Sequence, residues 1–378
     1  MILRKISLRQ FRAHSNTEVT FAPGINLIHG PNGAGKTNVL EAIHYLCIGQ
    51  SFVAAKDTYA LQFQTHFFDL RGEFEPAARP PFDVRLVFKP NEGKKAFINS
   101  APLERLSNLV GRVPVVVVAP GDHELTDGPP DGRRRFLDNT LSQARPSYLA
   151  ELLKYRRTMR QRNALLGRGK YVDPTLLHPW NEEFSRSAAK ITVERARFVA
   201  ELNTCVATAY SMMEAISEIP TVAYRPFQPI PEGATPDLVL DMHRERLQDA
   251  LPRELEQRRS LVGPHRDELV FKLNDVEVRR YASQGQHRTF GMALQLAKFL
   301  YLKAILNEAP ILLLDDVFGD LDRHRGSVFL KLLEESEEIG QSFITTADDS
   351  AFHDTIDFAK GMHSQQMIVK GALTPHAI

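Results

Sequence analysis

The segment Gly30-Pro31-Asn32-Gly33-Ala34-Gly35-Lys36-Thr37 constrains the fold of this chain more than any other feature. It has the Gly-x-x-x-x-Gly-Lys-Thr pattern of a phosphate-binding loop, and it lies between a predicted apolar strand at 25–29 and a predicted helix at 38–47. In such a loop the backbone N–H groups surround the β-phosphate, the lysine neutralises the β- and γ-phosphates, and the threonine ligates Mg²⁺. The sequence therefore predicts a nucleotide and Mg²⁺ site at Lys36 and Thr37. A chance glycine turn is the alternative, and the flanking strand and helix argue against it.

A second segment, Ser283-Gln284-Gly285-Gln286, predicts the start of a helix. Ser283 and Gln286 have the spacing of a capping box, and the apolar residues beyond them recur with helical periodicity. Gly285 in the first turn leaves the N-terminal backbone N–H groups accessible to an anion. Taken alone, this segment is also typical of an ordinary helix cap, so its interpretation depends on the residues that come after the helix in the chain.

A buried parallel strand is predicted at 311–314, where an apolar run follows Pro310 and ends in Asp315 and Asp316. The sequence Gly-Asp-Leu-Asp comes next, at 319–322. Many buried strands end in one aspartate for purely structural reasons. The order of capped helix, acidic strand and Gly-Asp-Leu-Asp is nevertheless the order found in ATP-binding-cassette ATPases.

Together these segments resemble the RecF family, the bacterial recombination mediators of the cassette and SMC ATPase group. The resemblance extends from end to end and is carried by the segments Leu8-Arg9-Gln10-Phe11-Arg12, Gly30 to Thr37, Gly132-Arg133-Arg134-Arg135-Phe136-Leu137-Asp138, Gly263-Pro264-His265-Arg266-Asp267, Ser283 to Thr289, and Leu312 to Asp322. Departures occur at Val53-Ala54, where the family tends to have Arg-Thr, at Gly121, where a glutamate is usual, and at Gly319-Asp320, where Ser-Glu is common. None of them removes a residue needed to bind or hydrolyse ATP.

The resemblance implies an α/β fold. We expect an ABC-type P-loop ATPase head, with a mixed sheet, flanking helices and an antiparallel β subdomain, and an inserted helical lobe without a long coiled coil. The head is expected to be discontinuous, at 1–120 and 261–378, and the mainly helical lobe to occupy 121–260. Apolar positions three and four apart between about residues 133 and 217 favour the helical assignment.

The resemblance also implies a catalytic mechanism in which two copies dimerise head to head around ATP and Mg²⁺. Lys36 is expected to act on the phosphates, while Thr37 and Asp315 hold the metal. Asp316 stands where cassette ATPases usually have a glutamate, so it is expected to activate the attacking water, and its shorter side chain predicts slow hydrolysis. The signature residues expected to meet the γ-phosphate bound by the other copy are Ser283, Gly285 and Gln286.

Three further assignments come from the same resemblance. Of the pair Thr345-Thr346, Thr346 is expected to sense the γ-phosphate, in the position where transporters have a switch histidine. Asp322 is expected to belong to a loop that crosses the dimer interface. Arg12 is expected either to approach the phosphates or to form a surface ion pair.

A basic stretch at 133–163 predicts a DNA-binding surface. It has nine basic residues against two acidic ones, and the basic residues are Arg133, Arg134, Arg135, Arg145, Lys154, Arg156, Arg157, Arg160 and Arg162. Arg156 and Arg160 share a helix face, which suits a phosphate backbone, and Arg133 and Arg134 are further candidate contacts. The alternative is a solvated helix face, or arginines paired with acids elsewhere in the fold.

The function implied by the resemblance is ATP-dependent DNA binding in recombinational repair, with weak, DNA-dependent ATP hydrolysis that resets the dimer. The expected partners are double-stranded DNA, with a preference for gap junctions where duplex meets single strand, RecR with RecO, and indirectly the recombinase RecA. One alternative is an SMC-like structural clamp, against which the lack of a long heptad array argues. Another is a transporter-type ATPase subunit, which would need a membrane partner.

Composition is compatible with this interpretation but does not distinguish it. The chain has 378 residues, of which 43% are hydrophobic and 25% charged, as in an ordinary globular protein. Its two cysteines cannot form a zinc cluster and suit a reducing cytoplasm. The formal net charge of +1 means that DNA binding must come from a local patch. No stretch is expected to cross a membrane, and the histidines lack metal-ligand spacing.

Overall fold

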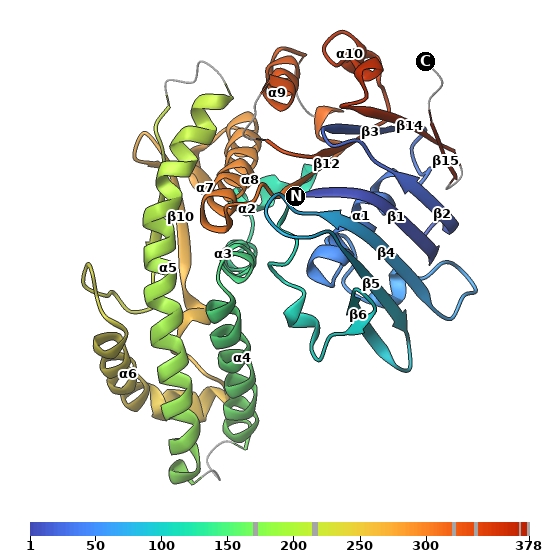
Figure 1. Ribbon diagram of the computed structural model, residues 1–378. Helices are drawn as coiled ribbons and strands as arrows, with labels where there is room; N and C mark the ends of the chain where they lie inside the picture. Colours follow the sequence, from blue (N-terminus) through green and yellow to red (C-terminus); the bar gives the residue numbers. More distant parts are fainter. Residues whose placement is uncertain (169–172, 214–217, 320–322, 336–338, 370–371, 376–378) are drawn as a thin grey trace. The chain divides into compact units, whose positions relative to one another are not determined.

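The computed structural model describes the chain except for residues 169–172, 214–217, 320–322, 336–338, 370–371 and 376–378 (Figure 1). The chain divides into two compact units. The first consists of Met1–Asp122, Thr208–Ile216 and Met292–Ile378, and the second of His123–Ala207 and Ser217–Gly291. The sequence interpretation places residues 261–291 in the head. The structure groups them with the second unit, where β10 (Glu268–Leu273) pairs with β9 (Pro220–Arg225).

The first unit contains two sheets, each of six strands. One is antiparallel, with the order β2-β1-β4-β5-β6-β7. Its strands are β1 (Ile2–Phe11), β2 (His14–Thr20), β4 (Phe68–Glu75), β5 (Phe82–Lys89), β6 (Gly93–Ile98) and β7 (Ala101–Pro102). In β1, Ile6 and Leu8 are buried while Arg9 is exposed, as expected of a sheet with one solvated face.

The other sheet of the first unit has the order β15-β14-β3-β13-β12-β8, and its strands are parallel except for β15. Its strands are β3 (Ile25–His29), β8 (Val115–Val118), β12 (Ile311–Asp315), β13 (Ser342–Thr346), β14 (Ser364–Val369) and β15 (Ala372–Pro375). Strands β3, β12 and β13 are buried along their whole length, which is typical of strands covered on both faces. The strand predicted at 25–29 is confirmed.

The parallel order of β3, β13 and β12 positions the candidate site. Because these strands are parallel neighbours, the segments that follow them lie at the same edge of the sheet. The register places Asp315 beside Thr345, and His29 beside Thr346. Helix α1 (Lys36–Ile48) follows β3, and its buried residues form one hydrophobic core with residues of both sheets. The fold thereby brings the phosphate loop, the acidic pair and the threonine pair together.

The second unit is mainly helical and has a three-stranded antiparallel sheet of order β11-β10-β9, in which β11 is Val276–Glu277. Beyond α1, the α-helices in the described part of the chain are α2 (Glu124–Asp127), α3 (Pro130–Ala144), α4 (Pro146–Leu166), α5 (His178–Met212), α6 (Pro236–Gln257), α7 (Val278–Tyr281), α8 (Gln284–Leu306), α9 (Arg323–Glu335) and α10 (Ser350–His353). Figure 1 shows α5, which has 35 residues, as a long helix, and most of it belongs to this unit. Proline lies in the first turn of α3, α4 and α6, where its missing N–H is not needed.

Two features differ from what the sequence predicts. Strand β9 lies in a proline-rich stretch from which no strand is predicted, and Pro220 is its first residue at the edge of the sheet, where a missing N–H is tolerated. Helix α8 is long and apolar enough to cross a membrane by length and composition alone, a feature not noted from the sequence. However, 61% of its apolar window is buried inside the fold, as is usual for a core helix.

Candidate nucleotide-binding site

The phosphate loop between β3 and α1 has the backbone geometry that its glycines allow. Gly30 has φ 150° and Gly35 φ 107°, values in the region that favours glycine. A Cβ atom on Gly30 would also come within 2.4 Å of the Ile368 carbonyl oxygen of β14. Lys36 at the start of α1 is buried, and its Nζ atom donates to the carbonyl oxygens of Gly30 at 2.8 Å and Pro31 at 3.2 Å. The lysine ammonium therefore lies against the loop, where the sequence predicts phosphate groups.

Thr37 and Asp315 form the candidate metal site. The Thr37 hydroxyl donates to Oδ1 of Asp315 at 2.8 Å, and the Thr345 hydroxyl donates to the same oxygen at 2.8 Å. Burial raises the pKa of Asp315, although the hydrogen bonds from Thr345 and Thr37 oppose this shift. A hydroxyl and a carboxylate are oxygen ligands that fit Mg²⁺, which usually takes only one or two carboxylates from the protein. Among the described residues, no group of three or more His, Cys, Asp or Glu side chains forms a dedicated metal cage.

Asp316, the predicted base, directly follows this site. It is exposed and has φ 50°, a left-handed conformation that aspartate tolerates better than most residues. Its backbone N–H donates to the carbonyl oxygen of Thr345 at 3.2 Å and to the Thr345 hydroxyl at 3.0 Å. Two adjacent carboxylates with different environments, one buried and one exposed, can divide the tasks of holding a metal and handling a proton.

Thr346, the predicted phosphate sensor, makes local contacts in the structure. Its hydroxyl donates to the carbonyl oxygen of Asp348 at 2.7 Å and accepts from the Asp348 N–H at 3.2 Å, so it shapes the loop after β13. The adjacent Thr345 is the threonine that contacts the acidic pair. Side chains alternate along a strand, and only the register with β12 shows which threonine faces Asp315.

Arg12 forms an ion pair, the second of its two expected environments, although its partner is buried. Its guanidinium donates to both carboxylate oxygens of Glu41 on α1, each at 2.8 Å, and Glu41 is 1% exposed. Ser51 also donates to Glu41. The hairpin of Arg12 contacts the phosphate loop, since His14 Nε2 lies 3.4 Å from the Gly35 carbonyl oxygen. Glu41 was not singled out from the sequence, because nothing local marks it as the partner of Arg12.

The signature segment lies at the exposed start of α8, in the second unit. The Ser283 N–H donates to Gln286 Oε1 at 2.8 Å, and the Gln286 N–H lies 3.3 Å from Ser283 Oγ, so the predicted capping box is present. Ser283 and Gly285 are exposed, and a Cβ atom on Gly285 would have only Ser283 Oγ within 4 Å, at 3.9 Å. Gln286 Nε2 donates to Glu218 at 2.6 Å. Asp322 lies outside the described residues.

The predicted DNA-binding arginines fall into two groups. Arg133 is 2% exposed, and its guanidinium donates to both carboxylate oxygens of Glu268, so it is held inside the fold. Arg134 donates to the carbonyl oxygen of Asp267 and to Asp131. On α4, the side chain of Arg156 is 50% exposed although it pairs with Asp138 at 2.8 Å.

Arg157 and Arg160, also on α4, are exposed and make no hydrogen bond or ion pair within the described part of the chain. Three positions separate them, so they lie near each other on the helix surface. The exposed arginines of α4 are therefore the ones able to meet a phosphate backbone, whereas Arg133 is itself buried and paired with Glu268.

Asp267 of the Gly-Pro-His-Arg-Asp segment belongs to a buried network. Arg195 on α5 donates to Asp267 Oδ2 at 2.7 Å and to Asp138 Oδ1 at 2.8 Å. The hydroxyls of Tyr224 and Tyr148 donate to Asp267 and Asp138 respectively. Burial raises the pKa of Asp267, whereas for Asp138 burial is outweighed, chiefly by the charge of Arg195, and its pKa is lowered. The network joins α3, α5 and β9 and has a structural role.

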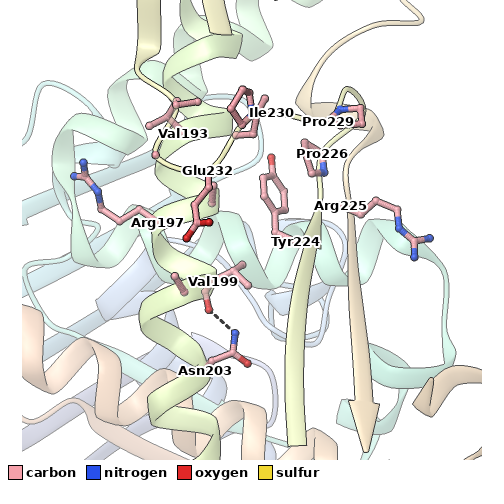
Figure 2. A pocket seen from close by; sticks show the side chains of 15 residues that line it. Val193, Arg197, Val199, Asn203, Tyr224, Arg225, Pro226, Pro229, Ile230 and Glu232 are labelled. Atoms are coloured by element: carbon pink, nitrogen blue, oxygen red, sulfur yellow. Dashed lines mark hydrogen bonds between the residues drawn. The ribbon is translucent and has the colours of Figure 1, made fainter. Parts of the chain in front are cut away.

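A pocket of about 750 Å³ lies in the second unit between α5 and the loop after β9 (Figure 2). Figure 2 shows Tyr224 and Glu232 within it, while the guanidinium groups of Arg197 and Arg225 extend away on opposite sides. Two polar side chains of its wall are already bonded: Asn203 exchanges two hydrogen bonds with the Val222 backbone, and the Tyr224 hydroxyl donates to Asp267. No predicted site residue lines this pocket.

Comparisons with known proteins include a family model over part of the chain and curated relatives over nearly all of it. A family model described as an AAA domain matches residues 5–165. The DNA replication and repair protein RecF of Salinibacter ruber is 44% identical, over 99% of this chain and 93% of the relative, and the protein of the same name from Chloroherpeton thalassium is 41% identical, over 93% and 96%.

Two solved structures identify the fold by similarity. A structure of the recombination mediator protein RecF-ATP in the RecFOR pathway is similar with a TM-score of 0.90 at 29% identity, over 99% of this chain and 97% of that chain. An SMC head bound to the C-winged helix domain of ScpA reaches a TM-score of 0.55 at 13% identity, over 99% and 96%, which is a likeness of fold alone. The predicted fold class, an α/β ATPase head of the ABC type, is confirmed.

Proposed function

The chain belongs to the RecF family of DNA replication and repair proteins, and on this premise we propose that it is an ATP-driven, DNA-binding dimer of recombinational repair. One observation carries the proposal. Thr37 of the phosphate loop and Thr345 both bond to Asp315, beside Lys36 and Asp316, as an ATP·Mg²⁺ site requires. A solved relative at 29% identity is named as RecF-ATP, which supports ATP as the nucleotide.

In the proposed mechanism, each copy binds and slowly hydrolyses ATP. Mg²⁺ would neutralise charge on the β- and γ-phosphates. Lys36 exchanges the carbonyl oxygens of Gly30 and Pro31 for phosphate oxygens, which are stronger partners because they are charged. Thr37 and Asp315 would hold the metal, and Asp316 would orient or deprotonate the attacking water. Hydrolysis is weak and stimulated by DNA, and it resets the dimer.

The proposed dimer has composite sites. Ser283, Gly285 and Gln286 of one copy meet the γ-phosphate held by the phosphate loop of the other, as the family resemblance implies. The exposure of Ser283 and Gly285 at a helix N-terminus supports this, because the helix dipole there favours an anion. ATP then joins two heads that each lack half of a complete site.

Duplex DNA is the proposed nucleic-acid partner, with a preference for gap junctions. The exposed arginines of α4, Arg156, Arg157 and Arg160, are the proposed phosphate contacts, with Arg134 in a supporting position. RecR acting with RecO, and indirectly RecA, are the proposed protein partners, since a solved relative is named as a mediator of the RecFOR pathway. The proposed location is the cytoplasm.

Measuring the mass of the purified protein in solution tests this function. Light scattering with ATP and Mg²⁺ should show a dimer, and a gapped duplex should bind that dimer more tightly than it binds the protein without nucleotide. A mass unchanged by ATP would contradict the dimer, and DNA binding indifferent to ATP would favour a structural clamp. The matched control is Lys36→Ala, which should neither dimerise nor gain affinity for DNA.

A further inference from the structure

Thr345 contacts both carboxylate residues of the ATP site through a single hydroxyl. It is fully buried at the end of β13, and its Oγ1 atom donates to Asp315 Oδ1 at 2.8 Å and accepts from the Asp316 N–H at 3.0 Å. A hydroxyl has one proton to donate and two lone pairs with which to accept. Both directions are therefore used within the acidic pair, since Asp315 Oδ1 is the nearer acceptor and the Leu314 carbonyl oxygen lies farther away, at 3.4 Å.

The hydrogen bond from the Thr345 hydroxyl orients the Asp315 carboxylate. Oδ1 of this carboxylate receives the hydroxyl protons of Thr37 and Thr345, so its two acceptor positions are filled. Oδ2 makes no hydrogen bond to any residue that the structure describes. The carboxylate is thereby held with Oδ2 as its available acceptor, the atom left for a metal-bound water.

Thr345 also fixes the backbone of Asp316. The Asp316 N–H has two acceptors on Thr345, the carbonyl oxygen at 3.2 Å and the hydroxyl at 3.0 Å. Asp316 adopts φ 50°, which is unfavourable for a residue with a Cβ atom and persists only where its surroundings hold it. Without the Thr345 hydroxyl, one of the two bonds at this turn is lost.

We propose that Thr345 is a positioning residue of the ATPase, which orients the Asp315 carboxylate toward the metal and holds the turn from which Asp316 reaches the attacking water. In this role Thr345 acts through its hydrogen bonds to the two aspartates. This inference rests on the proposed function, because it requires ATP hydrolysis with Mg²⁺.

A comparison of four side chains at position 345 distinguishes the contribution of the hydroxyl from that of the methyl group. Thr has both groups, Thr345→Val keeps the methyl, Thr345→Ser keeps the hydroxyl, and Thr345→Ala keeps neither. Each protein is assayed for nucleotide affinity without metal, for the Mg²⁺ dependence of binding to a fluorescent ATP analogue, and for kcat and KM of ATP hydrolysis. The Ser and Ala pair answers the question even if the Val protein fails to fold. Thr140→Val, which removes another fully buried threonine hydroxyl on α3, is the matched control.

We expect the proteins without the hydroxyl to bind metal-free nucleotide within about 2-fold of wild type, because Lys36 and the loop are intact. The Mg²⁺ concentration for half-maximal binding should rise about 10-fold and kcat should fall about 10- to 100-fold, with little change in KM, since hydrogen bonds to charged groups are the strong ones. Thr345→Ser should stay close to wild type. The inference is overturned if Val and Ala match wild type in Mg²⁺ dependence and kcat, or if Ser is as impaired as Ala. A wild-type protein that neither needs Mg²⁺ nor hydrolyses ATP would instead refute the proposed function.

Discussion

Arg195 is the side chain whose removal should most weaken the second unit. Its guanidinium lies between Asp138 and Asp267, and all three side chains are buried. Arg195→Met keeps most of the apolar stem and removes the charge, which leaves Asp267 without its cation and Asp138 with only the half-exposed Arg156. Breaking a buried ion pair from one side costs about 3–5 kcal/mol. At about 2–4 °C per kcal/mol for a unit of this size, the unfolding temperature should fall by roughly 6–20 °C.

The stability lost in Arg195→Met should depend on pH in a defined direction. In the wild type the pKa of Asp138 is lowered in the folded state, so its contribution to stability is lost as pH falls through that pKa. Burial already raises the pKa of Asp267, and without Arg195 this pKa should rise further, while the lowered pKa of Asp138 should rise as well. A folded variant that binds more protons than its unfolded chain gains stability as pH falls. The difference in the free energy of unfolding between wild type and variant should therefore become smaller as the pH falls from about 7 to about 5.

Calorimetric unfolding of both proteins across this pH range is the assay. Arg195→Lys, which keeps the charge but cannot reach both carboxylates with a fork of donors, should lose less than Arg195→Met. Adding Asp138→Asn and Asp267→Asn to the Met variant should recover part of the stability, because no unpaired charge remains. A difference below about 1 kcal/mol, or one that is constant with pH, would refute the view that two buried charges depend on Arg195.

Three other predictions address the proposed function. Lys36→Ala should abolish ATP-driven dimerisation because the charge facing the phosphates is lost. Asp316→Asn should instead dimerise but hydrolyse ATP slowly. If Asp316→Asn releases phosphate at the wild-type rate, Asp316 is not the base. Ser283→Arg should bind ATP as a monomer yet fail to dimerise in light scattering, and dimerisation with unchanged affinity would exclude the composite site. Replacing Arg157 and Arg160 by alanine should make the fall of log DNA affinity with log salt less steep, by up to about 4 units of slope per dimer. The matched control replaces Arg246 and Arg253, exposed on α6, and an equal effect there would show that only overall charge matters.

Much of the nucleotide site could be predicted because its signals are local. The glycine spacing of the phosphate loop and the apolar runs of β3 and β12 are continuous in sequence, and parallel strands gather their carboxyl ends at one edge. The sequence does not show which of two adjacent side chains on a strand faces the site. Thr345 and Thr346 are chemically alike and adjacent, so the choice between them needs the register of β13 against β12.

Long-range pairing sets the other limit on prediction. Arg133 counts as a cation in any window of sequence, but its partner Glu268 lies 135 positions away and only the fold brings the two together. The same holds for Arg12 and Glu41, and for Arg195 with Asp138. A local excess of basic residues therefore overstated the charge available to DNA. Burial, which decides this question, depends on contacts that span the chain.

The place of β3 in its sheet has a consequence for synthesis on the ribosome. This strand carries the phosphate loop and emerges early, yet its neighbours in the sheet are β13 and β14, which begin at Ser342 and Ser364. At about 5–20 residues per second, the roughly 300 intervening residues take about 15–60 s to translate. Throughout that time Leu27 and Ile28, fully buried in the finished fold, have no sheet to enter. The nascent chain is then expected to need a chaperone for this strand and to bind ATP only once translation is almost complete.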